Sequence, residues 1–211
     1  DAVISWRAKH LADASGYWWS LPVVAETWDG LLNDINGFHV KEQHAHDAIE
    51  NAKSGPVAEG NVGGGTGMIC HAFKGGIGTS SRIVKIDNDE YTLGVLVQAN
   101  YGERAKFTIA GVPVGKEITD LMPRDNYENM DAGIGSIIVA VATDAPLVAH
   151  QLKRLAKRVA LGVGRIGGYG HDGSGDIFIA FSTANSNAAF AKGKVALEMI
   201  PNWIMSPLFE A

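Results

Sequence analysis

One segment of the chain combines an unhindered carbonyl group with a nucleophile. Gly135 precedes Ser136, which opens the apolar run Ile-Ile-Val-Ala-Val-Ala. The Ser136 hydroxyl could attack the carbonyl carbon of Gly135 and move the acyl group from nitrogen to oxygen. Water would then release a chain whose first residue carries a nucleophilic hydroxyl beside its own α-amine, which titrates near ~7.7–8.0 and can act as a base. The alternative interpretation is a Gly-rich loop that simply enters a strand.

Other reactive residue types occur in patterns that favour no site. The glycine runs between residues 60 and 78 contain neither a P-loop pattern nor a G-x-G-x-x-G that opens a helix, so we expect tight turns there and no nucleotide. His44 and His46 are two positions apart in an expected helix, which favours a solvated surface over a metal site. Cys70 and His71 are neighbours in sequence, and such neighbours rarely face each other. We expect no cofactor and no metal.

The composition is that of a folded globular protein. Of the 211 residues, 46% are hydrophobic and 19% are charged. The net charge of −5 argues against a nucleic-acid or anionic-membrane partner, because phosphates need clustered Lys and Arg. The single cysteine excludes an internal disulfide framework, and no apolar stretch reaches the length of a membrane span. The chain begins with Asp1 and not Met, so we expect that the true start is missing. We expect a cytoplasmic or periplasmic location.

The elements that must position Ser136 alternate between strand and helix. Residues 136–143 are typical of a strand buried on both faces, and 176–182 of another buried strand. Apolar residues at 148, 152, 155 and 159 predict a helix that starts near the proline at 146. Upstream we expect a helix over 38–54, a hairpin with strands 83–86 and 91–99, and a short strand at 107–109. No linker divides the chain, so we expect a single domain over residues 1–211.

Several motifs in order resemble the L-aminopeptidase/D-alanyl-esterase family, which includes the β-peptidyl aminopeptidases. They are Asn61-Val-Gly-Gly-Gly-Thr-Gly-Met, Phe73-Lys-Gly-Gly-Ile-Gly-Thr-Ser-Ser-Arg82, Gly135-Ser136 and Ala142-Thr-Asp-Ala-Pro-Leu147. The resemblance implies an α+β fold, a four-layer αββα sandwich like that of N-terminal nucleophile (Ntn) hydrolases but with different connectivity. It also implies a longer precursor that cleaves itself before a serine, here into 1–135 and 136–211. The paired chains would assemble as a tetramer.

The resemblance assigns catalytic roles to residues in three segments. Ser136 matches the self-released nucleophile, and Gly135 matches the residue before the cut. Ser174 and Asp176 match a serine and an acidic residue two positions on. Because residues two apart in an extended segment point to the same face, both could reach the Ser136 amine and hydroxyl. Family members often have Glu where Asp176 stands, and Asp is one methylene shorter. Asn100 matches the asparagine that donates to the oxyanion, a device typically worth ~10²–10³ in rate.

A further segment resembles the part of the family that recognises the substrate's free amine. It reads Val23-Val-Ala-Glu26-Thr-Trp28-Asp-Gly30. Glu26 matches the carboxylate that binds the ammonium group. The family commonly has a tyrosine where Trp28 stands, and the indole N–H could donate to the oxyanion in place of the hydroxyl.

We therefore expect a self-processing serine aminopeptidase, amidase or esterase that works through an acyl-enzyme on Ser136. Its substrates would be small peptides or amino-acyl amides and esters, and its protein partners would be copies of itself. Two alternatives stay open. One is an acyltransferase of the ornithine acetyltransferase type, a family that uses threonine as its nucleophile. The other is a non-enzymatic binding module on the same fold.

Overall fold

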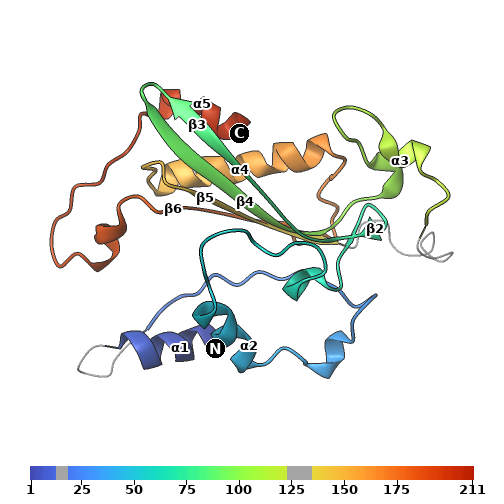
Figure 1. The fold of residues 1–211 in the computed structure, drawn as a ribbon, viewed down its shortest axis with the longest axis horizontal. Helices are drawn as coiled ribbons and strands as arrows, with labels where there is room; N and C mark the ends of the chain where they lie inside the picture. The colour runs from blue at the N-terminus through green and yellow to red at the C-terminus, as the bar shows by residue number, and fades with distance from the viewer. Residues whose placement is uncertain (13–18, 123–134) are drawn as a thin grey trace. The chain divides into compact units, whose positions relative to one another are not determined.

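The computed structural model describes residues 1–12, 19–122 and 135–211 (Figure 1). The chain divides into two compact units. The first contains residues 1–25 and 29–57, and the second contains Glu26–Trp28 together with Ala58–Ala211. Each unit is described by itself, and the single domain stays a prediction.

The first unit is built on two helices, α1 (Ala2–Leu11) and α2 (Glu42–Glu50), with the 3-10 turn η1 (Ile35–Gly37) between them in sequence. Polar contacts join the helices: the Trp6 indole N–H donates to Glu50 at 3.1 Å, and His46 Nε2 lies 3.1 Å from the carbonyl of Ala2. The helix predicted over 38–54 is shorter than expected. Phe38 has a left-handed backbone (φ 48), and α2 begins only after Lys41, whose N–H is bound by His44.

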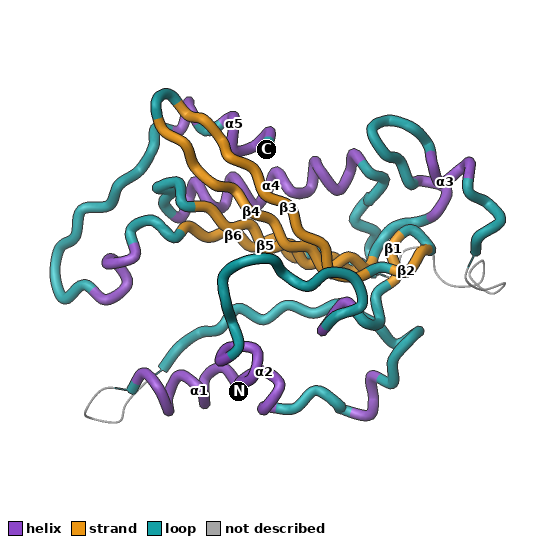
Figure 2. Tube along the Cα trace, viewed as in Figure 1, coloured by secondary structure: helices purple, strands orange, loops and turns teal. Residues whose placement is uncertain are grey.

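The second unit is built on a four-stranded sheet with the order β3-β4-β5-β6 (Figure 2). The strands are β3 (Gly76–Ile86), β4 (Asp89–Asn100), β5 (Ser136–Thr143) and β6 (Ile177–Ser182). β3, β4 and β5 pair antiparallel, whereas β5 and β6 pair in parallel. A second sheet contains β1 (Ile69–Cys70) and β2 (Phe73–Lys74). The strand expected at 107–109 is wrong: a single bridge joins Ile109 to Val112 there.

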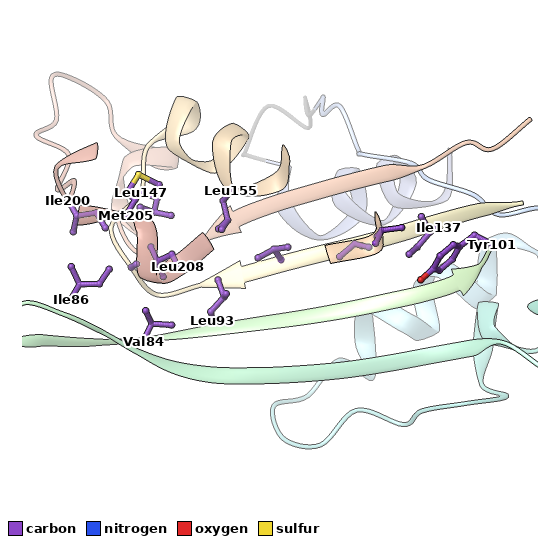
Figure 3. Close-up of a cluster of buried hydrophobic side chains, with 14 residues drawn as sticks. Val84, Ile86, Leu93, Tyr101, Ile137, Leu147, Leu155, Ile200, Met205 and Leu208 are labelled. Carbon is purple, nitrogen blue, oxygen red and sulfur yellow. The ribbon is translucent and has the colours of Figure 1, made fainter. Parts of the chain in front are cut away.

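The helices of this unit include α4 (Ala149–Arg165) and α5 (Ser206–Glu210), which pack against one face of the sheet. Figure 3 shows their side chains, such as Leu155 and Leu208, gathered with those of the strands in one core. In β5, Ile137 is 2% exposed, and alternate residues along the strand share its burial. The remaining helical segments among the described residues are α3 (Val114–Glu117), η2 (Gly63–Gly65), η3 (Arg104–Lys106), η5 (Ser186–Phe190) and η6 (Asn202–Ile204). None of the described helices has the length and apolar character needed to cross a bilayer.

The predicted strand over 136–143 is confirmed, and it lies in the interior of the sheet. β5 is flanked by β4 on one side and by β6 on the other. Its first residue is Ser136, so the nucleophile suggested by the sequence stands where a central strand begins. The fold is α+β, as expected.

Candidate active site

Ser136 and Asn100 lie opposite each other on neighbouring strands. Asn100 is the last residue of β4 and pairs with Ser136, the first residue of β5. Side chains at directly opposite positions of an antiparallel pair lie on the same face of the sheet. Both residues are buried, with 6% and 5% of their surface exposed. The sheet therefore brings a side-chain amide next to the serine.

Two hydrogen bonds fix the orientation of the Asn100 amide. Its Oδ1 accepts the N–H of Ile69 at 2.9 Å, and its Nδ2 donates to the carbonyl of Trp28 at 2.7 Å. With the oxygen held by one donor and the nitrogen by one acceptor, the amide cannot flip without losing both bonds. Because an amide nitrogen carries two N–H groups, the second can serve another acceptor.

The loop before β6 contacts Ser136 through its backbone. Ser174 forms a parallel bridge with Gly135, and the N–H of Gly175 donates to Ser136 Oγ at 3.1 Å. Ser174 Oγ donates to Asp176 Oδ1 at 2.6 Å, so the shorter acidic side chain reaches this serine directly. Within the described residues, Ser174 and Asp176 thus bond to each other, and Ser136 Oγ bonds to Gly175. Nothing in the sequence singled out Gly175.

A pocket of about 700 Å³ opens over Ser136, within the usual size range of small-molecule sites. It is lined by Glu26, Trp28, Gly135, Ser136, Asp172, Gly173, Ser174 and Gly175. A Cβ added to Gly175 would lie 3.3 Å from Ser136 Oγ and 3.9 Å from Glu26 Oε1. The absent side chain at Gly175 therefore leaves room between the serine and the carboxylate. Asn100 donates to the Trp28 carbonyl and is not part of the lining.

The Glu26–Trp28 segment is held by β4 and by the Gly-rich loop. Gln98 Nε2 donates to Thr27 Oγ1 at 2.6 Å, and Thr27 Oγ1 contacts Met68 Sδ at 3.0 Å. Together with the bond from Asn100 to the Trp28 carbonyl, these contacts hold Thr27 and Trp28 within the second unit. The residues on either side of Thr27, both of which line the pocket, are thereby positioned.

The Gly-rich loop is closed by a lysine that the sequence analysis missed. Lys74 Nζ donates to the carbonyls of Gly65, Met68 and Gly75 at 2.9, 3.0 and 2.8 Å. Partial desolvation lowers the pKa of Lys74. The loop in turn supplies the Ile69 N–H that holds Asn100. A Cβ on Gly65 or Gly75 would overlap the carbonyl oxygen of Gly60 or Ala99, so these glycines permit close backbone contacts beside the site.

Cys70 and His71 pack away from the pocket. Burial raises the pKa of the Cys70 thiol to about 11, which keeps it neutral at ordinary pH. His71 is 2% exposed and stacks on Phe107 with ring centroids 4.5 Å apart. Burial also lowers the pKa of this imidazole. Both residues belong to the packing around β4 and not to the lining of the pocket.

A buried serine that begins a central strand, with a fixed amide opposite it and a polar loop beside it, is the arrangement of an Ntn-type hydrolase fold. The chain is similar to a solved L-aminopeptidase D-Ala-esterase/amidase from Ochrobactrum anthropi, described as a new variant among the Ntn hydrolase fold. The identity is 47%, the TM-score is 0.89, and the match covers 100% of this chain and 57% of that one. A beta-aminopeptidase from Burkholderia sp. matches with 46% identity and a TM-score of 0.85, over 99% of this chain and 57% of that one. The expected fold is confirmed.

The chain belongs to peptidase family S58, whose family profile matches residues 1–211. Beta-peptidyl aminopeptidase BapA of Sphingosinicella microcystinivorans is 55% identical over 223 residues, which cover 100% of this chain and 55% of that protein. The BapA of Sphingosinicella xenopeptidilytica is 49% identical over 192 residues, 88% of this chain and 48% of that protein. The chain therefore spans about half the length of the curated relatives it matches. The family resemblance is confirmed.

Proposed function

We propose that this chain carries the nucleophile of a self-processing serine aminopeptidase that releases N-terminal residues from small peptides, amides or esters. One observation carries the proposal: Ser136 begins a central strand and lines a pocket in which Gly175 N–H donates to its hydroxyl oxygen. The aminopeptidase and esterase activities named for the relatives support the same reaction class. Nothing in the relatives favours an acyltransferase or a binding module.

Self-processing would begin with attack of Ser136 Oγ on the carbonyl carbon of Gly135. The C–N bond between the two residues breaks, an ester forms, and water cleaves the ester to leave a carboxylate on Gly135 and an amine on Ser136. A Cβ on Gly135 would lie 2.6 Å from the carbonyl oxygen of Asn100, so the backbone at this position leaves no room for a side chain. This close approach supports a glycine before the cut.

In turnover, the neutral Ser136 amine would accept the hydroxyl proton while Oγ attacks the substrate's carbonyl. Negative charge then develops on the carbonyl oxygen, where the second N–H of Asn100 is a suitable donor. The Ser136 ammonium group then returns its proton to the leaving amine or alcohol, and water cleaves the acyl-enzyme. Ser174 and Asp176, which are joined by a hydrogen bond, would help to hold and relay the proton.

Substrate selection would depend on the carboxylate of Glu26. It shares the pocket with Ser136 and lies across Gly175 from the hydroxyl. A free α-ammonium group bound to Glu26 would place the adjacent carbonyl near Ser136, which restricts hydrolysis to the first residue. Assembly into a tetramer of processed pairs and a cytoplasmic or periplasmic location stay predictions.

The test compares the parent protein with Ser136→Ala and with Ser81→Ala, a matched change on the exposed part of β3. Intact mass and a denaturing gel report cleavage at 135–136, and a panel of amino-acyl p-nitroanilides reports activity. We expect two chains and activity in the parent and in Ser81→Ala, and one inactive chain in Ser136→Ala. Cleavage at the same bond in Ser136→Ala contradicts the proposal.

A further inference from the structure

One side-chain contact joins the loop beside Ser136 to the segment that follows Asn100. His171 Nε2 lies 3.0 Å from Glu103 Oε1, and the two side chains are 35% and 30% exposed. His171 precedes Ser174 by three residues, and Glu103 follows Asn100 by three residues. The contact therefore connects the two backbone segments between which the serine lies.

The His171 end of this contact is coupled to the residues that touch Ser136. The carbonyl of His171 accepts the N–H of Ser174 at 2.8 Å, which closes a tight turn. The next N–H along the chain, that of Gly175, donates to Ser136 Oγ. A displacement of the His171 ring that carries its backbone with it would therefore move both Ser174 and Gly175.

The Glu103 end of the contact is anchored in the packed interior. The carbonyl of Glu103 lies 3.1 Å from Nδ1 of His71, a residue that is 2% exposed. Gly102, just before it, has a φ of 87° and lies so close to the His71 ring that a Cβ would overlap it. Glu103 is thus the fixed partner, and His171 is the one on the loop.

The loop is costly to order because it is rich in glycine. Three of the six residues from 170 to 175 are glycines: Gly170, which has a φ of 59°, Gly173 and Gly175. Glycine loses more conformational entropy on ordering than any other residue. His171 Nε2 is buried, and Glu103 Oε1, 3.0 Å away, is its ionic partner when the imidazole is protonated, although the two atoms are not at hydrogen-bond geometry. Separating the pair would leave this buried nitrogen without its ionic partner.

We propose that His171 and Glu103 form a positioning pair that holds the loop 170–175 where Ser174 and the Gly175 N–H meet Ser136. Neither residue lines the pocket, so both act through the loop. The kinetic consequences of this inference rest on the function proposed above, whereas its structural consequences do not.

Hydrogen exchange in the full protein tests the structural part without any assay of activity. Exchange is measured at the Ser174 and Gly175 amides in the parent, in His171→Ala and in His150→Ala, a matched change at an exposed position of α4. We expect exchange to become about fivefold faster in His171→Ala and to stay unchanged in His150→Ala. A fivefold change is near the upper limit of what a partly exposed ion pair contributes to stability. Unchanged protection in His171→Ala overturns the proposal, whatever the protein's activity.

Kinetics test the functional part. We expect His171→Ala and Glu103→Ala each to lower kcat about fivefold with little change in KM, and the double variant to be no worse than either single one. His171→Gln keeps an N–H that can donate to Glu103 and should recover most of the parent kcat. Additive losses in the double variant overturn the pairing. A parent without aminopeptidase activity contradicts the proposed function and leaves the exchange result to decide on the pair.

Discussion

Asn100 and Ser136 occupy opposite positions at the ends of β4 and β5, so backbone pairing sets the separation of amide and hydroxyl. The pairing continues without a break from Asn100–Ser136 to Leu93–Thr143. A shift in register would move every core side chain of β5 to the wrong face, which makes this arrangement costly to disturb. Two residues far apart in sequence are therefore positioned by a sheet and not by loop conformation.

Asn100→Ala is expected to lower kcat by about 10²–10³ for every substrate, because negative charge develops on the carbonyl oxygen in all of them. Asn100→Asp keeps an acceptor for the Ile69 N–H and should lose as much, since the N–H donor is gone. Steady-state rates on an ester and an amide check both changes. Recovery of activity in Asn100→Asp would show that the residue serves only to hold Ile69.

Glu26→Gln is expected to weaken chiefly those substrates that carry a free α-amine. The loss in kcat/KM should be about 10–100-fold, the usual cost of a charge-assisted bond. Matched pairs of amino-acyl esters and their N-acetylated forms provide the measurement, and the acetylated forms should already be poor for the parent. Equal losses on both members of a pair would remove Glu26 from amine recognition.

Asp176→Asn is expected to shift the rising limb of the pH–rate profile to lower pH. A carboxylate near the Ser136 amine favours the ammonium form and raises the pKa of the amine, so its removal must lower that pKa. Because the amine acts as a base in its neutral form, activity should then appear at lower pH, even if its plateau falls. Profiles of kcat/KM are compared with those of Asp87→Asn, which changes an aspartate at the turn between β3 and β4. A midpoint that stays or rises places Asp176 away from the amine.

Lys74→Met is expected to destabilise the second unit by about 1–2 kcal/mol and to lower kcat. Methionine keeps most of the aliphatic length but removes the ammonium group that donates to the carbonyls of Gly65, Met68 and Gly75. Urea unfolding gives the free energy, with Lys85→Met as a matched change at an exposed position of β3. Equal stability of the two variants would mean that water replaces the ammonium group without cost.

The sequence predicted the parts of the site that depend on local pattern. The apolar run after Ser136 is continuous, so β5 was predictable with its bounds, and the spacing of Ser174 and Asp176 anticipated that they share one region. The start of β3 was missed because Gly76 and Gly78 are unfavourable in strands, although here they lie beside crowded backbone or open space.

Long-range contacts could not be predicted from the sequence. The bond between Gln98 and Thr27 and the three carbonyls around Lys74 join residues whose proximity no local periodicity encodes. The proximity of His171 to Glu103 likewise depends on where two loops end after the sheet has formed. The sequence could therefore indicate the reactive groups of the site, but not the contacts that hold them in place.

The order of strands in the sheet has a consequence for how a processed protein would unfold. A cut before Ser136 would leave β4 on one polypeptide and β5 and β6 on the other, although β4 and β5 share a continuous ladder. Unfolding would then separate two molecules, so the melting temperature should rise with protein concentration. The uncut Ser136→Ala chain has β4, β5 and β6 on one polypeptide. Its melting temperature should therefore not depend on protein concentration through the separation of two chains.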